Sequence, residues 1–137
     1  MEWDWEFAWS ILPQLLAGFR ITLIATALGA VVAAVLGLVF AILRRSRNRL
    51  VSRTTGFVVE FIRGTPLLVQ LYFIFYVLPD LGIRLPALTA GVIGMGLHYA
   101  TYTAEVYRGG IEAVAKGQWE AAKATNLTAR QTWIHVI

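Results

Sequence analysis

Four polar side chains share one face of an otherwise apolar stretch. They stand at i, i+3, i+4 and i+7, the spacing that aligns residues along one side of a helix: His98, Thr101, Tyr102 and Glu105. Ionisable groups inside a membrane are costly and normally face a bundle interior or a water-filled cavity. The stripe is therefore a candidate lining for a translocation pathway. The alternative is that His98 and Glu105 only hydrogen-bond to neighbouring helices.

Other chemistries find little support in the sequence. One histidine and one carboxylate two turns apart provide neither a metal-ligand set nor a nucleophile with its base. The sequence contains no Gly-Lys dipeptide, so it lacks the end of a phosphate-cradling P-loop, and it contains no cysteine. We therefore expect no enzyme activity, metal or cofactor in this chain. Any nucleotide hydrolysis must come from a partner.

Three apolar stretches are expected to position the stripe by crossing a bilayer. Residues 21–43 carry no charge and, as a helix, would measure about 35 Å. Further spans are predicted at 57–78 and 87–107. A hydrophobic content of 58% and a mean hydropathy of +0.64 are higher than is usual for a soluble domain. The fold class is thus an all-α membrane protein.

The distribution of basic residues predicts the orientation. Nine lysines and arginines fall in the proposed inner segments, 44–56 and 108–137, against Arg20 and Arg84 alone in the outer ones. Cytoplasmic loops hold such an excess. The N-terminus is therefore expected outside and the C-terminus inside. The net charge of +4 is explained by this topology, so nucleic acid is not an expected partner.

The N-terminal segment, residues 1–20, is predicted to lie at the outer interface. It interleaves acidic residues with aromatic ones, as an aromatic belt does: Trp3, Trp5, Phe7 and Trp9. A disordered acidic tail is the alternative. Pro13 is expected to open a short interfacial helix through Phe19. The acidic start lacks the basic region of a signal peptide, so the first helix is expected to be retained.

Two spans carry further patterns. In the first, small residues recur every four positions, which lets helices approach closely in lipid: Ala25, Gly29, Ala33, Gly37 and Ala41. In the second, Glu60 and Arg63 are spaced to pair on one helix face. The Gly64-Thr65-Pro66 sequence predicts either a kink or a fresh helix with Thr65 as its N-cap.

The last thirty residues are polar enough to leave the bilayer. They predict a short helix over 111–115, a turn at Lys116 and Gly117, and a helix over 118–125 with Trp119 and Ala122 on one face. Asn126 occupies a C-terminal cap position that needs a positive φ, and Thr128 with Gln131 forms a capping box for another helix. Such a pair could read DNA, but nearby acidic residues weaken that surface, and a protein-docking loop is favoured.

These residues carry a resemblance to a known family. The run Gly117, Gln118, Trp119, Glu120, Ala121 and Ala122, followed by the turn at Asn126, resembles the EAA loop of ABC importer permeases of the polar amino acid uptake branch. Three other stretches of that family agree in order: residues 15–23, 63–70 and 102–111. The resemblance covers about 15–137. It implies a type I ABC importer transmembrane (MetI-like) fold with three of the expected five membrane helices.

The resemblance also implies function and partners. The chain would be the permease subunit of an ATP-driven importer in the bacterial inner membrane, with an EAA coupling loop over 108–137. Its implied partners are an ABC ATPase dimer, a second permease subunit and an extracytoplasmic substrate-binding protein. Glu60 and Arg63 are expected to fix the second span near the coupling joint.

Two departures from the family pattern refine these expectations. Asn126 stands where the family usually has Gly, and together with Leu97-His98-Tyr99 and residues 102–107 it makes the chain most similar to ectoine and hydroxyectoine permeases. The family would continue past Ile137 with a Leu-Pro motif and two helices, so a fragment or truncated product is expected. A three-span membrane anchor with a docking helix pair, or an ion channel, is the competing interpretation.

Overall fold

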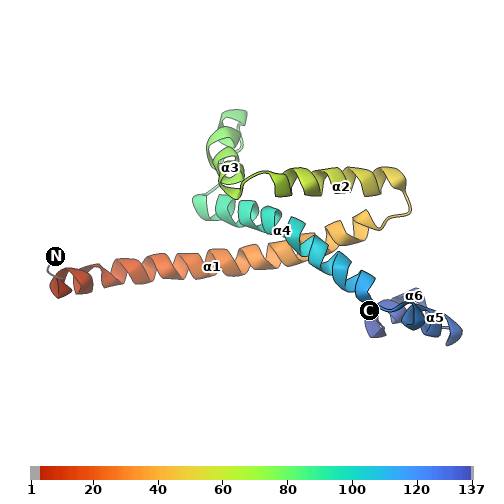
Figure 1. Ribbon diagram of the computed structural model, residues 1–137. Helices are drawn as coiled ribbons and strands as arrows, with labels where there is room; N and C mark the ends of the chain where they lie inside the picture. The colour runs from red at the N-terminus through yellow and green to blue at the C-terminus, as the bar shows by residue number, and fades with distance from the viewer. Residues whose placement is uncertain (1–3, 137) are drawn as a thin grey trace.

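The computed structural model describes residues 4–136. Its first element, α1 (Trp5–Arg44), is one continuous helix of 40 residues, about 60 Å long (Figure 1). The Asp4 side chain caps it by accepting a hydrogen bond from the backbone N–H of Phe7 at 2.9 Å. The expected separate helix from Pro13 to Phe19 is wrong, because Pro13 lies inside α1. Trp3 lies outside the described residues.

The second predicted span is broken into pieces. Helix α2 (Arg49–Gly64) begins inside the segment expected to be a loop, because Asn48 caps it by accepting from the N–H of Leu50. After Thr65 and Pro66 the chain continues as α3 (Leu67–Tyr72), a π-helical turn η1 (Phe73–Val77) and a 3₁₀ turn η2 (Leu78–Leu81). The two halves meet at 97°. The expected break is confirmed, and Pro66 explains it, since proline disfavours helical φ and ψ at the residue before it.

The third predicted span is longer than expected. Helix α4 (Ala87–Ala113) runs through residues 108–113, so the separate short helix over 111–115 is wrong. Two short helices follow, α5 (Lys116–Ala124) and α6 (Ala129–His135). Lys116 and Gly117 are the first residues of α5, not a turn, because the chain already changes direction at Val114 and Ala115.

By length and composition, α1 is the one described helix that qualifies alone as a membrane span. The bent pair of α2 with Leu67–Leu81 qualifies if it is counted as one span. Among the described residues α4 does not reach that apolar standard, because glycines and the polar stripe dilute its aliphatic residues. By this criterion residues 4–136 contain one or two candidate spans, and the three spans expected from the sequence stay a prediction.

The core lies where α4 crosses α1 (Figure 1). Four of the five residues in the small-residue ridge are buried on α1: Gly29, Ala33, Gly37 and Ala41. At Gly37 an added Cβ would lie 2.8 Å from the Cβ of Thr103 and 3.1 Å from the carbonyl oxygen of Ala100. Close backbone approach therefore requires glycine at this position.

Replacing Gly37 tests this packing. We expect Gly37→Leu to separate α1 from α4, because the new side chain meets backbone as well as the side chain of Thr103. Overpacking of this kind costs about 1–3 kcal/mol or more. Thermal unfolding in detergent measures the loss. Gly18→Leu is the matched control, since no atom lies within 4 Å of a Cβ built there. Equal melting temperatures for the two variants would contradict the assigned contact.

Candidate functional site

The helix pair α5–α6 lies together at the C-terminal end of α4 (Figure 1). Asn126 has a φ of 56°, the left-handed conformation expected from the sequence. The N–H of Leu127 donates to the carbonyl of Ala122 at 3.0 Å, and that of Asn126 donates to Lys123 at 3.0 Å. These two bonds form a Schellman motif, which ends α5 and reverses the chain. The capping box of Thr128 and Gln131 then begins α6 as predicted.

The two faces of α5 have different environments. Ala122 is buried, and half-buried Trp119 meets Trp133 of α6 edge-on, with ring centroids 6.2 Å apart. The remaining residues of the predicted coupling surface are exposed: Gly117, Gln118, Glu120, Ala121 and Asn126. Trp119 and Trp133 also line a cavity of about 540 Å³ with the C-terminal end of α1. The inner face of α5 thus carries the Trp119–Trp133 contact with α6, and the outer face is exposed.

The Asn126 turn gives a direct test of this geometry. We expect Asn126→Val to destabilise the turn by about 1–2 kcal/mol, because a β-branched residue resists positive φ. Asn126→Gly is the matched variant and should keep or slightly improve the turn. Hydrogen exchange at the Leu127 amide measures local opening. Equal exchange in the two variants would show that the left-handed turn carries no such strain.

An ion-pair network joins α1, α2 and α4 at the same end of the molecule. Arg44 contacts the carboxylate of Glu105 directly and lies 3.9 Å from that of Glu60. Arg108 binds Glu105 at 2.8 Å and Glu112 at 2.6 Å. The Arg44 and Glu105 side chains are each 23% exposed, so water screens them little. Arg44 therefore links three helices at the base of the polar stripe.

This network corrects the predicted pair of Glu60 with Arg63. Glu60 is 66% exposed and turns to Arg44 instead, although both residues of the predicted pair lie on α2. Arg44 is not among the predicted site residues, because membrane topology alone accounts for a basic residue at that position. The sequence does contain a signal for this role. Arg44 directly follows the uncharged run and so lies at the membrane boundary, where a buried carboxylate needs a basic partner.

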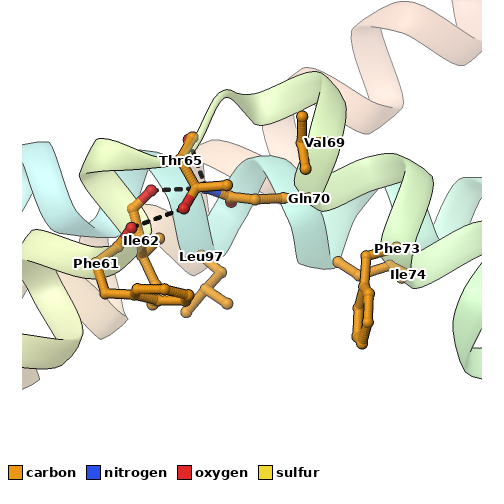
Figure 2. Close-up of a pocket in the computed structure, with 8 residues that line it drawn as sticks. All are labelled: Phe61, Ile62, Thr65, Val69, Gln70, Phe73, Ile74 and Leu97. Atoms are coloured by element: carbon orange, nitrogen blue, oxygen red, sulfur yellow. Dashed lines mark hydrogen bonds between the residues drawn. The ribbon is translucent and has the colours of Figure 1, made fainter.

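The break between α2 and α3 is held by Gln70. Its Nε2 donates to the carbonyl oxygens of Ile62 at 2.7 Å and Thr65 at 2.9 Å, at the C-terminal end of α2 (Figure 2). Thr65 is not the predicted N-cap of α3. Its hydroxyl donates back to the Phe61 carbonyl at 2.9 Å, and Pro66 occupies the cap position. Gln70 is not among the site residues predicted from the sequence.

The polar stripe ends at this break. His98 is buried, and its Nδ1 lies 3.1 Å from Nε2 of Gln70. Thr101 is fully buried and donates to the His98 carbonyl, whereas Tyr102 is 44% exposed beside the His98 ring. His98 and Glu105 thus each contact another helix, as the packing alternative expected. The structure brings all four stripe residues to one side of α4.

The Gln70 amide leaves one polar atom without a partner. Its Oε1 is buried and accepts no hydrogen bond from any of the described residues 4–136. The same side chain lines a largely apolar cavity of about 350 Å³ with Thr65, Leu97 and apolar residues of α2 and α3 (Figure 2). An unpaired buried acceptor costs about 1–3 kcal/mol, so this oxygen is a candidate hydrogen-bond acceptor for a bound molecule or water.

Comparison with known proteins places this geometry in context. A family model described as "Binding-protein-dependent transport system inner membrane component" matches residues 33–137. A probable amino-acid ABC transporter permease protein, y4tG of Sinorhizobium fredii, is 53% identical over 131 residues, which are 96% of this chain and 57% of that protein. The L-cystine transport system permease protein TcyB of Bacillus subtilis is 37% identical and matches 93% of this chain and 55% of its own length.

Two further similarities cover the whole chain. The glutamine transport system permease protein GlnP of Escherichia coli is 32% identical over 100% of this chain and 64% of its own length. A solved structure described as an amino acid ABC transporter with histidines superposes with a TM-score of 0.88 at 35% identity, over 100% of this chain and 64% of that one. The chain thus spans roughly three fifths of the relatives it matches.

Proposed function

The chain belongs to the family of binding-protein-dependent transport system inner membrane components, and we propose that it forms the coupling part of a permease that imports polar amino acids or related compatible solutes. Members of this family are membrane components of a transporter rather than enzymes. The chain is accordingly all-helical, with the fold of an ABC importer permease.

The observation that carries the proposal is the joint between α4 and α5. Only Val114 and Ala115 separate the two helices, and α5 is then locked by its Schellman turn and by Ala122. A force on the exposed face of α5 therefore reaches α4 through very little flexible chain. A cytoplasmic ATPase dimer that closes on nucleotide would push α5, and α4 would shift between inward-open and outward-open arrangements.

The partners follow from this division of labour. An ATPase dimer supplies hydrolysis, a second permease subunit completes the pathway, and an extracytoplasmic binding protein delivers the substrate. The basic residues near the end of α1 support a cytoplasmic location for that end and an outer location for the N-terminus. Nucleic acid and a metal cofactor play no part in this proposal.

The pathway is proposed to pass the break between α2 and α3. Membrane transporters commonly place substrate sites at discontinuous helices, whose unwound backbone offers polar groups. The unpaired Oε1 of Gln70 is an acceptor for a substrate ammonium group, and His98 lies beside it. Tyr102 offers an exposed hydroxyl one turn further along α4.

The substrate class rests on the relatives. Those compared above are described as permeases for amino acids, L-cystine and glutamine, which supports a small zwitterion for this chain too. Ectoine or hydroxyectoine is a narrower candidate, supported by Asn126 and the Leu97-His98-Tyr99 run. Competition of labelled glutamine uptake by unlabelled ectoine separates the two. Absence of competition would reject the narrower substrate.

Copurification and uptake test the proposal as a whole. We expect the chain to copurify with an ABC ATPase and to support ATP-dependent uptake of a polar amino acid in vesicles that contain the assembled transporter. A non-transporting membrane anchor predicts neither result. Stable membrane insertion without any ATPase association would therefore overturn the proposed function.

The polar stripe is tested separately. His98→Leu is expected to raise the KM for uptake about tenfold, because it removes the proposed hydrogen bond from His98 to the charged substrate. Such a bond is worth about 1.5–3 kcal/mol. Val106→Ala is the control, since Val106 is 71% exposed and lies off the stripe. ATPase association should stay normal in both. If the uptake kinetics of His98→Leu match the wild type, the stripe serves packing alone.

A further inference from the structure

A charged cleft lies where the end of α1, the first part of α2 and the end of α4 meet. Its volume is about 500 Å³, and arginines and glutamates form much of its lining: Arg44, Arg45, Arg53, Arg108, Glu60 and Glu112. The hydroxyl of Ser52 donates to the Arg44 carbonyl at 2.7 Å and fixes α2 against the end of α1. The cleft is therefore bounded by helices, and also by Arg45 of the short connection between α1 and α2.

The two glutamates of this lining are already engaged. Glu60 lies 3.9 Å from Arg44, and Glu112 binds Arg108 at 2.6 Å. Within the described part of the chain, neither Arg45 nor Arg53 forms an ion pair with another residue. Arg45, which follows α1, and Arg53 of α2 thus both line the cleft, and neither has an ion-pair partner among residues 4–136.

We propose that this cleft binds the phosphate headgroup of an anionic phospholipid. The planar guanidinium group can donate two parallel hydrogen bonds to phosphate oxygens, and Arg45 and Arg53 together can hold one phosphodiester. Arg44 and Arg108 are neutralised by Glu60, Glu105 and Glu112, so the positive charge left in the cleft comes from Arg45 and Arg53. Basic pockets between membrane helices are suited to lipid headgroups of this charge.

The surface beside the cleft favours a lipid over a free anion. Phe57 lines the cleft and is 70% exposed, and it stacks on Phe61, which is 65% exposed, with ring centroids 6.3 Å apart. These rings form an apolar strip along α2 that starts at the cleft. An acyl chain gains from burying that strip, whereas inorganic phosphate does not. The inference rests on the family's membrane location and not on the proposed transport activity.

Lipid binding to the purified chain tests this site. Native mass spectrometry with added phosphatidylglycerol should show binding that phosphatidylcholine does not match. The double variant Arg45→Gln/Arg53→Gln should bind phosphatidylglycerol about 30-fold more weakly, from the typical contribution of two basic residues at an anionic membrane surface. Arg84→Gln/Arg130→Gln removes the same charge elsewhere and should bind like the wild type.

Two further measurements distinguish a lipid phosphate from free phosphate and separate loss of binding from loss of folding. An equal concentration of inorganic phosphate should leave lipid binding unchanged, and full competition by it would overturn the lipid assignment. Arg45→Lys/Arg53→Lys keeps the charge but loses the planar guanidinium groups, so its affinity for phosphatidylglycerol should lie between those of the wild type and the Gln double variant. This variant keeps the test valid if the Gln double variant folds poorly. Lipid binding by the Lys pair that equals the wild type, or binding of phosphatidylcholine that equals phosphatidylglycerol, would also overturn the proposal.

Discussion

Ala121→Glu is expected to abolish the association of this chain with its ATPase while leaving membrane insertion intact. Ala121 is exposed on the outer face of α5, so a longer side chain costs nothing in the folded chain itself. In a docked complex the new carboxylate would be buried without a partner, at a cost of several kcal/mol. Affinity should therefore fall at least about 30-fold, measured by copurification and by titration of ATPase activity.

The control for this prediction is Ala113→Glu. It adds the same carboxylate at an exposed position, but on the last residue of α4 rather than on α5. Its ATPase association should be close to normal. Trp119 is a poorer probe, since it packs on Trp133, and a charge there would disturb the helix pair as well as the docking surface. Normal coupling in Ala121→Glu would show that α5 does not meet the ATPase.

Arg44→Met is expected to be the most destabilising single change in the charged network. It leaves Glu105 with Arg108 alone and frees Glu60, so α1 loses its ionic contacts to both α2 and α4. Breaking a buried pair costs about 3–5 kcal/mol, and partial exposure reduces this to about 1–3 kcal/mol here. A double-mutant cycle with Glu105→Gln, followed by thermal unfolding in detergent, isolates the coupling energy.

Arg47→Met is the matched control for the cycle. Arg47 is exposed, and it forms no ion pair among the described residues, so its loss should change the melting temperature little. A coupling energy between Arg44 and Glu105 near zero would mean that the contact forms only in one arrangement of the helices. In that case the network would act during conformational change rather than in folding.

Local features were predicted well from the sequence. Each depends on residues close together in the chain, as the positive φ of Asn126, the Thr128 capping box and the break at Pro66 show. Periodicity likewise placed the small-residue ridge on one face of α1, and that face is the one that packs on α4. These features are fixed by backbone stereochemistry and by the helical repeat, which a single sequence displays directly.

Contacts between distant residues were decided only by the tertiary structure. Charge spacing paired Glu60 with Arg63, but Arg44 competes for Glu60 because α2 folds back beside the end of α1. Glu105 pairs with the same Arg44, which is 61 residues away in the chain. The side chain of Gln70 in α3 donates to the backbone carbonyl oxygens of Ile62 and Thr65 at the end of α2. The sequence determined which groups need partners inside a membrane. Only the packing of α1, α2 and α4 determined which partners come within reach, because electrostatic pairing depends on distance in space and not along the chain.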